Sequence, residues 1–113
     1  MKKPSQQAML RQIQKMQDDM QAAQQALETE TVEVSVGGGA ITVVITGHQR
    51  VQDIKVNKDL LDLEDAEWLN DLQDLLVVAM NQAVEQSQMM AAERMEAITG
   101  GLGNMPGLGG LLG

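Results

Sequence analysis

Few side chains in this 113-residue sequence have the chemistry of a catalytic or metal site. His48 is the only histidine, and cysteine is absent. With one imidazole and no thiol, the sequence shows no nucleophile–base set and too few ligands for the usual zinc sites. His48 lies in a short polar stretch between two β-like segments, so we expect it to have a structural role in a turn. We predict that the protein is not an enzyme and needs no cofactor and no metal.

Two further motifs resemble sites but lack essential parts. Five carboxylates gather between residues 59 and 67, without the central glycine and the alternate ligand positions of a calcium loop. Capping of backbone N–H groups and solvation explain them better. The run Gly37–Gly39 is followed by a β-like segment, whereas a phosphate-binding loop is followed by lysine and a helix. Neither motif predicts a ligand site.

The basic residues cluster near the N-terminus. Residues 1–27 have a balance of +2, residues 28–58 of −1 and residues 59–113 of −9, for a net charge of −8. If a polyanion binds to this protein, it should therefore contact the N-terminal part of the chain. The candidate DNA-binding residues are Lys2, Lys3, Arg11 and Lys15. An ordinary solvated helix face is the simpler alternative for these four charges. Trp68 stands alone in acidic surroundings and offers no stacking platform for single strands.

A helix is predicted from about Ser5 to Leu27. Its apolar residues recur at spacings of 4, 3, 4, 3 and 4, which is the pattern of a coiled-coil seam. Such a narrow stripe favours a partner helix, and we expect a homodimer. The alternative is that the stripe covers one sheet of its own chain. The candidate dimer-interface residues are Met9, Ile13, Met16 and Met20, and the stripe continues through Ala23 to Leu27.

Three β-strands are predicted next, over Thr31–Val36, Ala40–Thr46 and Arg50–Val56. Apolar β-branched residues alternate with polar ones along them, which indicates strands with one buried face. The short connections between them fit hairpin turns, so the strands form an antiparallel meander. A second long helix is predicted from Leu63 to about Ile98, with Asp62 as its N-cap. The fold class is therefore α+β, with one domain over residues 1–99.

The last 14 residues differ in composition from the domain. Seven of them are glycine, so we expect residues 100–113 to be a flexible Gly-rich tail. Leu102, Met105, Leu108 and Leu111 recur at every third residue, which leaves a docking segment as the alternative. No signal peptide and no membrane-spanning apolar run are visible, so we expect a cytoplasmic protein without a membrane partner.

The order of these elements resembles the YbaB/EbfC family of nucleoid-associated proteins. The resemblance covers nearly the whole chain: the helix MLRQIQKMQDDMQAAQQAL, the meander GGGAITVVITGHQRVQDIKV, the stretch NKDLLDLEDAEWLNDLQDLLVVAMNQAVEQSQ and the tail GGLGNMPGLGGLLG. It implies a homodimer in the cytoplasm that is associated with the nucleoid. It also implies weak binding of duplex DNA, mainly through phosphates and with low sequence specificity, and an effect on nucleoid organisation or gene expression. Replication or recombination proteins are plausible further partners.

The sequence departs from the family pattern in its first helix. Where relatives usually carry more lysine, glutamine occupies much of the polar surface, at positions 12, 14, 17, 21, 24 and 25. This departure leaves the predicted fold unchanged but reduces the positive charge available for phosphates. The alternative function is a dimeric protein-interaction scaffold in DNA replication or recombination that does not bind DNA directly.

Overall fold

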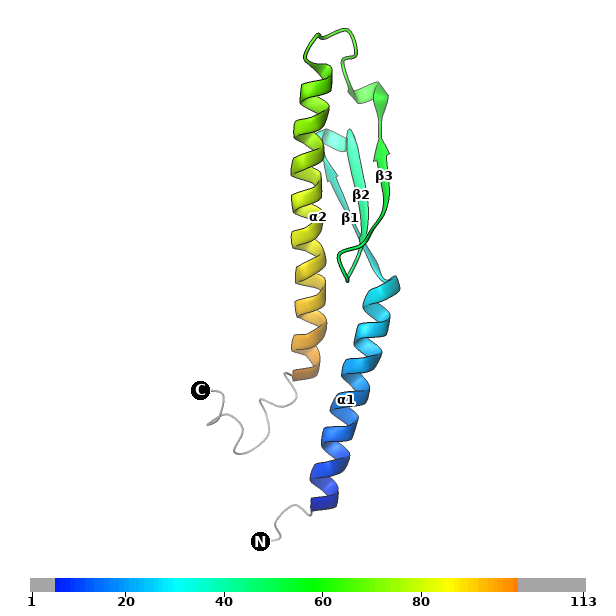
Figure 1. Ribbon diagram of the computed structural model, residues 1–113, viewed down its shortest axis with the longest axis vertical. Coiled ribbons are helices and arrows are strands. Elements are labelled where there is room, and N and C mark those ends of the chain that lie inside the picture. The colour runs from blue at the N-terminus through cyan, green and yellow to red at the C-terminus, as the bar shows by residue number, and fades with distance from the viewer. Residues whose placement is uncertain (1–5, 100–113) are drawn as a thin grey trace, which may run out of the picture. The chain divides into compact units, whose positions relative to one another are not determined.

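The computed structural model describes residues 6–99, which form two long helices and a three-stranded sheet (Figure 1). The predicted order of helix, meander and long helix is confirmed, and the fold is α+β. The predicted tail at residues 100–113, together with Lys2 and Lys3, lies outside the described residues. The elements are α1 (Gln6–Thr29), β1 (Thr31–Val36), β2 (Ile41–Thr46), β3 (Val51–Val56) and α2 (Trp68–Thr99).

The chain divides into two compact units. The first, here called the helical unit, contains α1 up to Ala26 and the chain from Ala92 onward, which includes the last eight residues of α2. The second, here called the sheet unit, is Leu27–Ala91. Helix α2 therefore contributes to both units.

The sheet is an antiparallel meander in the order β1-β2-β3. Val34 pairs with Val43 and Val43 with Ile54, so the apolar residues of all three strands lie on one face. The connection between β1 and β2 is a short 3₁₀ turn at Gly37–Gly39 in which all three glycines have positive φ. Side chains with a Cβ rarely adopt this conformation, which explains the glycine run as backbone geometry.

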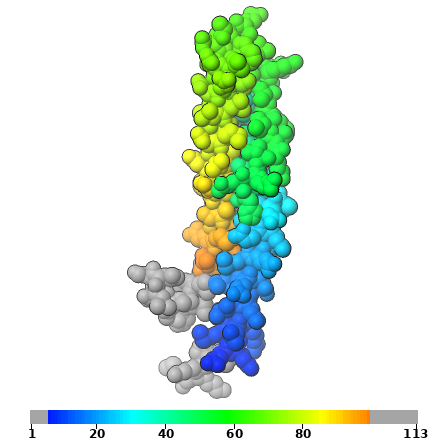
Figure 2. Space-filling model, viewed as in Figure 1, coloured from blue at the N-terminus to red at the C-terminus, as the bar shows by residue number. Residues whose placement is uncertain are grey.

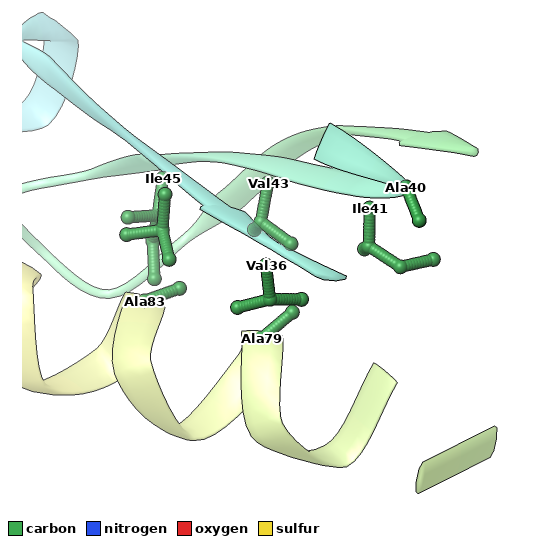
Figure 3. Packing of buried hydrophobic residues seen from close by; sticks show 8 residues of the cluster. Val36, Ala40, Ile41, Val43, Ile45, Ala79 and Ala83 are labelled. Atoms are coloured by element: carbon green, nitrogen blue, oxygen red, sulfur yellow. The ribbon is translucent and has the colours of Figure 1, made fainter. Parts of the chain in front are cut away.

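Helix α2 covers part of the apolar sheet face and forms the core of the sheet unit. Ala79 and Ala83 point from α2 toward the valines and isoleucines of the strands (Figure 3). These two alanines and the β2 residues Ile41, Val43 and Ile45 are all fully buried. The small alanine side chains let the helix approach the sheet closely, so the larger β-branched residues fill the space between them.

The turn between β2 and β3 is attached to α2 by a buried hydrogen-bond pair. The Ser87 hydroxyl donates to the Thr46 carbonyl over 2.7 Å and accepts from the Gln49 backbone N–H over 3.0 Å. The Thr46 hydroxyl accepts from the backbone N–H groups of His48 and Arg50. His48 thus lies in a turn, as predicted, with its backbone held by this network.

Helix α2 begins five residues later than the sequence predicted. The predicted start at Leu63 is wrong because Asp62 and Asp65 each close a separate local turn. The Asp62 carboxylate accepts from the Glu64 backbone N–H, and the Asp65 carboxylate accepts from the Glu67 backbone N–H. Short acidic side chains compete with the helix in this way, and the regular helix begins only at Trp68.

Candidate nucleic-acid interface

The predicted DNA-binding residues that the structure describes lie on α1. Arg11 and Lys15 are one turn apart on this helix and both are exposed. Residues separated by four positions lie on the same side of a helix. Their side chains therefore project from a common side of α1 into solvent, where a phosphate group could reach them.

Lys15 lines a groove of about 760 Å³ in the helical unit. On α1 the groove follows residues separated by three or four positions, and on α2 it includes Arg94, Ala97 and Ile98. Alanine side chains make up much of its wall, which leaves the groove open between larger neighbours. The lining residues are Gln12, Lys15, Met16, Asp19, Ala22, Ala23, Ala26, Arg94, Ala97 and Ile98.

The groove brings Arg94 into the same site as Lys15. These residues are 79 positions apart in the sequence, so the N-terminal charge cluster did not include Arg94. It is half-buried and interacts within the chain. Asp19 lines the same groove and reduces the local positive charge. The site is therefore weakly cationic rather than strongly basic.

The two units differ sharply in charge. The helical unit contains five basic and four acidic residues, whereas the sheet unit contains three basic and twelve acidic residues. The net charges are +1 and −9, and these add to the −8 of the whole chain. A polyanion is therefore repelled by the sheet unit and attracted, weakly, to the helical unit.

The predicted seam of α1 is only partly used within the chain. Ala23 and Leu27 are buried, and Met16 lines the groove. Met9 and Ile13, by contrast, are 53% and 46% exposed. Met20 is also exposed, so this stripe of apolar side chains on α1 has room for a partner.

A second unpartnered apolar surface lies on β3. Ile54 and Val56 share the core face of the sheet through pairing with Val43 and Ile41, yet they are 43% and 46% exposed. Helix α2 therefore covers the sheet incompletely and leaves the β3 side of its apolar face open. The surfaces of β3 (green) and of α2 (yellow-green) both face the viewer in Figure 2.

The other motifs singled out in the sequence do not assemble into a site in the described part of the chain. Over residues 6–99, no group of three or more histidine, aspartate or glutamate side chains is placed to hold a metal ion. Of the carboxylates between residues 59 and 67, those of Asp62 and Asp65 accept hydrogen bonds from nearby backbone N–H groups, and that of Glu67 accepts from the Asn70 side chain. Among those same residues, neither helix is long and apolar enough to cross a membrane.

Comparison with known proteins identifies the family. The model of the YbaB/EbfC DNA-binding family matches residues 1–102. This chain belongs to the YbaB/EbfC family. A relative from Ruminiclostridium cellulolyticum is 46% identical over 100 residues, which are 88% of this chain and 84% of the relative. A relative from Alkaliphilus metalliredigens is 44% identical over 105 residues, which are 93% and 89% of the two chains. Both are named nucleoid-associated proteins.

Membership of the YbaB/EbfC family agrees with the resemblance read from the sequence. The family is a DNA-binding family and not an enzyme family. Its match extends through both units, so neither the sheet nor the helical groove is an addition to the family domain. Arg94, a groove residue that the sequence reasoning did not include, could be found only from the fold, because α2 brings it back to α1.

Proposed function

We propose that this protein is a nucleoid-associated homodimer that binds duplex DNA through phosphate contacts on its helical unit. The observation that carries the proposal is the division of charge, +1 on the helical unit and −9 on the sheet unit. The contacts come from Lys2, Lys3, Arg11, Lys15 and Arg94, which are all the basic residues of that unit. The DNA-binding family and the names of its relatives support this role.

The small number of positive charges determines the character of binding. Phosphate contacts position a protein on DNA but carry no base information, so the sequence preference should be low. If about four to six of the ten basic residues on the two helical units of a dimer neutralise a phosphate, the logarithm of affinity should fall with the logarithm of salt concentration with a slope of about 3.5 to 5.5. Raising the salt from 50 to 200 mM would then lower affinity roughly 10²- to 10³-fold.

A gel-shift or anisotropy titration with random duplex DNA across a salt series tests this proposal. The variant Lys15→Gln with Arg94→Gln should lower both the affinity and the salt slope, by about 0.9 in slope for each phosphate that is no longer neutralised. The matched control is Arg50→Gln with Lys58→Gln, which removes the same charge from the sheet unit. The control should bind almost as tightly as the unmodified protein.

Two outcomes would contradict the proposal. If the control variant loses as much affinity as the Lys15/Arg94 variant, net charge and not the helical unit determines binding. If no shift is seen at low salt with tens of micromolar protein, the alternative gains support, namely a dimeric scaffold for replication or recombination proteins. The glutamines that cover α1 are the observation that favours this alternative.

Dimer formation is the second part of the proposal. It is supported by two exposed apolar surfaces, one formed by Met9, Ile13 and Met20 on α1 and the other by Ile54 and Val56 on β3. Strand β3 is also an edge strand, and unpaired edges favour association with another chain. Covering these surfaces with a second copy removes apolar area from water and stabilises the pair.

Light scattering at micromolar concentration should give twice the chain mass. Ile54→Asp should produce monomers, because a carboxylate would be buried in the interface at a cost of several kcal/mol. Lys55→Asp is the control, since residue 55 lies on the opposite face of β3. Ile13→Asp together with Met20→Asp tests the α1 surface in the same way. A monomeric unmodified protein would refute the dimer.

The cellular location follows from the same proposal. Binding to chromosomal DNA places the protein at the nucleoid, in the cytoplasm, where it would affect nucleoid organisation or gene expression. The relatives' name, nucleoid-associated protein, supports this location. A fluorescent fusion should co-localise with a DNA stain, and the Lys15/Arg94 variant should spread through the cytoplasm.

A further inference from the structure

One acidic side chain lies in the same groove as the candidate DNA contacts. The helical unit contains four acidic residues, and all four lie in the part of the chain that the structure describes. Of these, Asp19 is the one that lines the groove, together with Lys15 and Arg94. The other three are exposed and do not line it: Asp18, Glu93 and Glu96. The groove therefore combines two cationic groups with one carboxylate.

The direction of the two helices places Asp19 between these basic residues. Over residues 6–15 of α1 every residue is exposed, and Met16 is the first that is partly buried, so the described part of α2 reaches α1 at about this position. The helices run in opposite directions within the helical unit (Figure 1), and Arg94 is five residues before the end of α2. Arg94 therefore lies farther along α1 than Asp19, whereas Lys15 lies one turn before Asp19. A DNA backbone that contacts both basic residues passes the carboxylate.

The Asp19 carboxylate opposes phosphate binding at short range. One turn of α-helix rises about 5.4 Å, so a phosphate held by Lys15 lies on the order of 7 Å from this carboxylate. At that separation in water, the repulsion between two unit charges corresponds to roughly a three-fold change in affinity. A carboxylate on the far side of a helix about 10 Å wide acts over a longer distance, where salt screens most of the repulsion. The position of an acidic residue therefore matters more than its number.

We propose that Asp19 limits the affinity of the groove for DNA, because its carboxylate repels the phosphates that Lys15 and Arg94 attract. The inference rests on the proposed DNA-binding function and assigns the control of affinity at that site to one residue. Binding is then weak because of where this negative charge lies, and not only because basic residues are few. The protein exchanges between DNA sites more readily than its basic residues alone would allow.

Matched substitutions separate the position of the charge from its amount. Asp19→Asn removes the groove carboxylate, whereas Asp18→Asn and Glu96→Gln each remove one carboxylate from outside the groove. Asp18 lies about 100° around α1 from Asp19, and Glu96 lies about 200° around α2 from Arg94. The three variants have the same net charge. Aspartate and asparagine have similar helix propensities, so the two α1 variants should be equally stable.

The measurement is an anisotropy titration with random duplex DNA at low salt. Asp19→Asn should bind about ten-fold more tightly than the unmodified protein, because roughly three-fold is gained at each of the two grooves of a dimer. Each control should gain less than about three-fold, because its carboxylate is farther from the bound phosphates. The advantage of Asp19→Asn should shrink as salt is raised, since salt screens the repulsion. A change in helix stability alone would not produce this dependence on salt.

A double-mutant cycle tests whether Asp19 acts at the groove. In a protein that already contains Lys15→Gln and Arg94→Gln, phosphates no longer occupy the groove, so Asp19→Asn should have almost no effect on affinity. Such non-additivity is expected when residues act on one ligand at one place.

Three outcomes would overturn the inference while DNA binding itself remains. The first is equal affinity of Asp19→Asn and the unmodified protein, which would make Asp19 an ordinary solvated residue. The second is an equal gain in all three variants, which would show that net charge determines affinity. The third is a full gain from Asp19→Asn without the two basic residues. If no protein in the series shifts duplex DNA at low salt and tens of micromolar concentration, the proposed function fails, and the role of Asp19 fails with it.

Discussion

Replacing Ser87 with alanine should lower the free energy of unfolding by about 1–2 kcal/mol. The Ser87 side chain is fully buried, and its hydroxyl makes two hydrogen bonds to the turn that follows β2. Each such bond contributes roughly 0.5–1.5 kcal/mol net when it is exchanged for water. The turn is 38 to 41 residues away in the sequence, so these bonds join α2 to the sheet across the sheet unit.

The cost of Ser87→Ala stays below the penalty for a fully unsatisfied buried pair. The Gln49 N–H also donates to the Thr46 carbonyl, over 3.1 Å, so both groups keep one partner when the hydroxyl is removed. Alanine also has a higher helix propensity than serine, and this offsets the loss in the free energy of unfolding by about 0.5 kcal/mol. Position 88 is exposed on the same helix, and the difference between Gln88→Ser and Gln88→Ala measures this propensity term directly.

Urea unfolding followed by circular dichroism measures the effect. All variants must be compared at one protein concentration, because the stability of the proposed dimer would depend on concentration. Amide hydrogen exchange at Gln49 provides a local readout and should become faster in Ser87→Ala. The reasoning is refuted if Ser87→Ala, corrected by the position-88 difference, is as stable as the unmodified protein and exchange at Gln49 is unchanged.

Three other substitutions in the sheet unit should have measurable effects on unfolding. Gly47→Ala should cost about 1–3 kcal/mol, because a Cβ at residue 47 would lie 3.0 Å from the Leu27 Cβ and closer still to a methyl group of Leu27. Gly38→Ala should cost about 1–2 kcal/mol for a different reason, since the added Cβ meets open space but the residue has a φ of 67°. Thr46→Val keeps the shape of the side chain and removes the acceptor for two backbone N–H groups, so we expect a loss of about 1–2 kcal/mol. Thermal melts would check all three, and a stable Gly47→Ala would show that Leu27 moves away freely.

Local patterns were sufficient to predict the elements of this fold. Alternation of apolar and polar residues identified all three strands to within one residue at each end. The first helix was predicted because its apolar spacing of three and four is specific to helices. The start of α2 was predicted wrongly, because a good N-cap at Asp62 was taken for the N-cap of the long helix. Sequence spacing does not distinguish a cap that starts a long helix from one that closes a single turn.

Interactions between distant segments were not accessible in the same way. Nothing in the sequence indicates that Ser87 bonds to the β2–β3 turn, since serine on a helix is usually solvated. Lys15 and Arg94 line the same groove because the last turns of α2 lie beside α1. No local sequence pattern encodes this placement. The same applies to β3. Its alternation predicted a buried face, but Ile54 and Val56 remain half exposed because one helix is too narrow to cover three strands.

The length of α2 connects the two parts of the proposed function. Its 32 residues are about 48 Å long, which exceeds what a sheet of six-residue strands can cover. The first part packs on the strands through Ala79 and Ala83, and the last eight residues join α1 instead. The acidic residues of α2 before Ala92 therefore belong to the sheet unit, and Arg94 belongs to the groove. A shorter α2 could still cover the strands but would leave α1 without the α2 side of the groove, so the additional turns build the helical unit and not the sheet core.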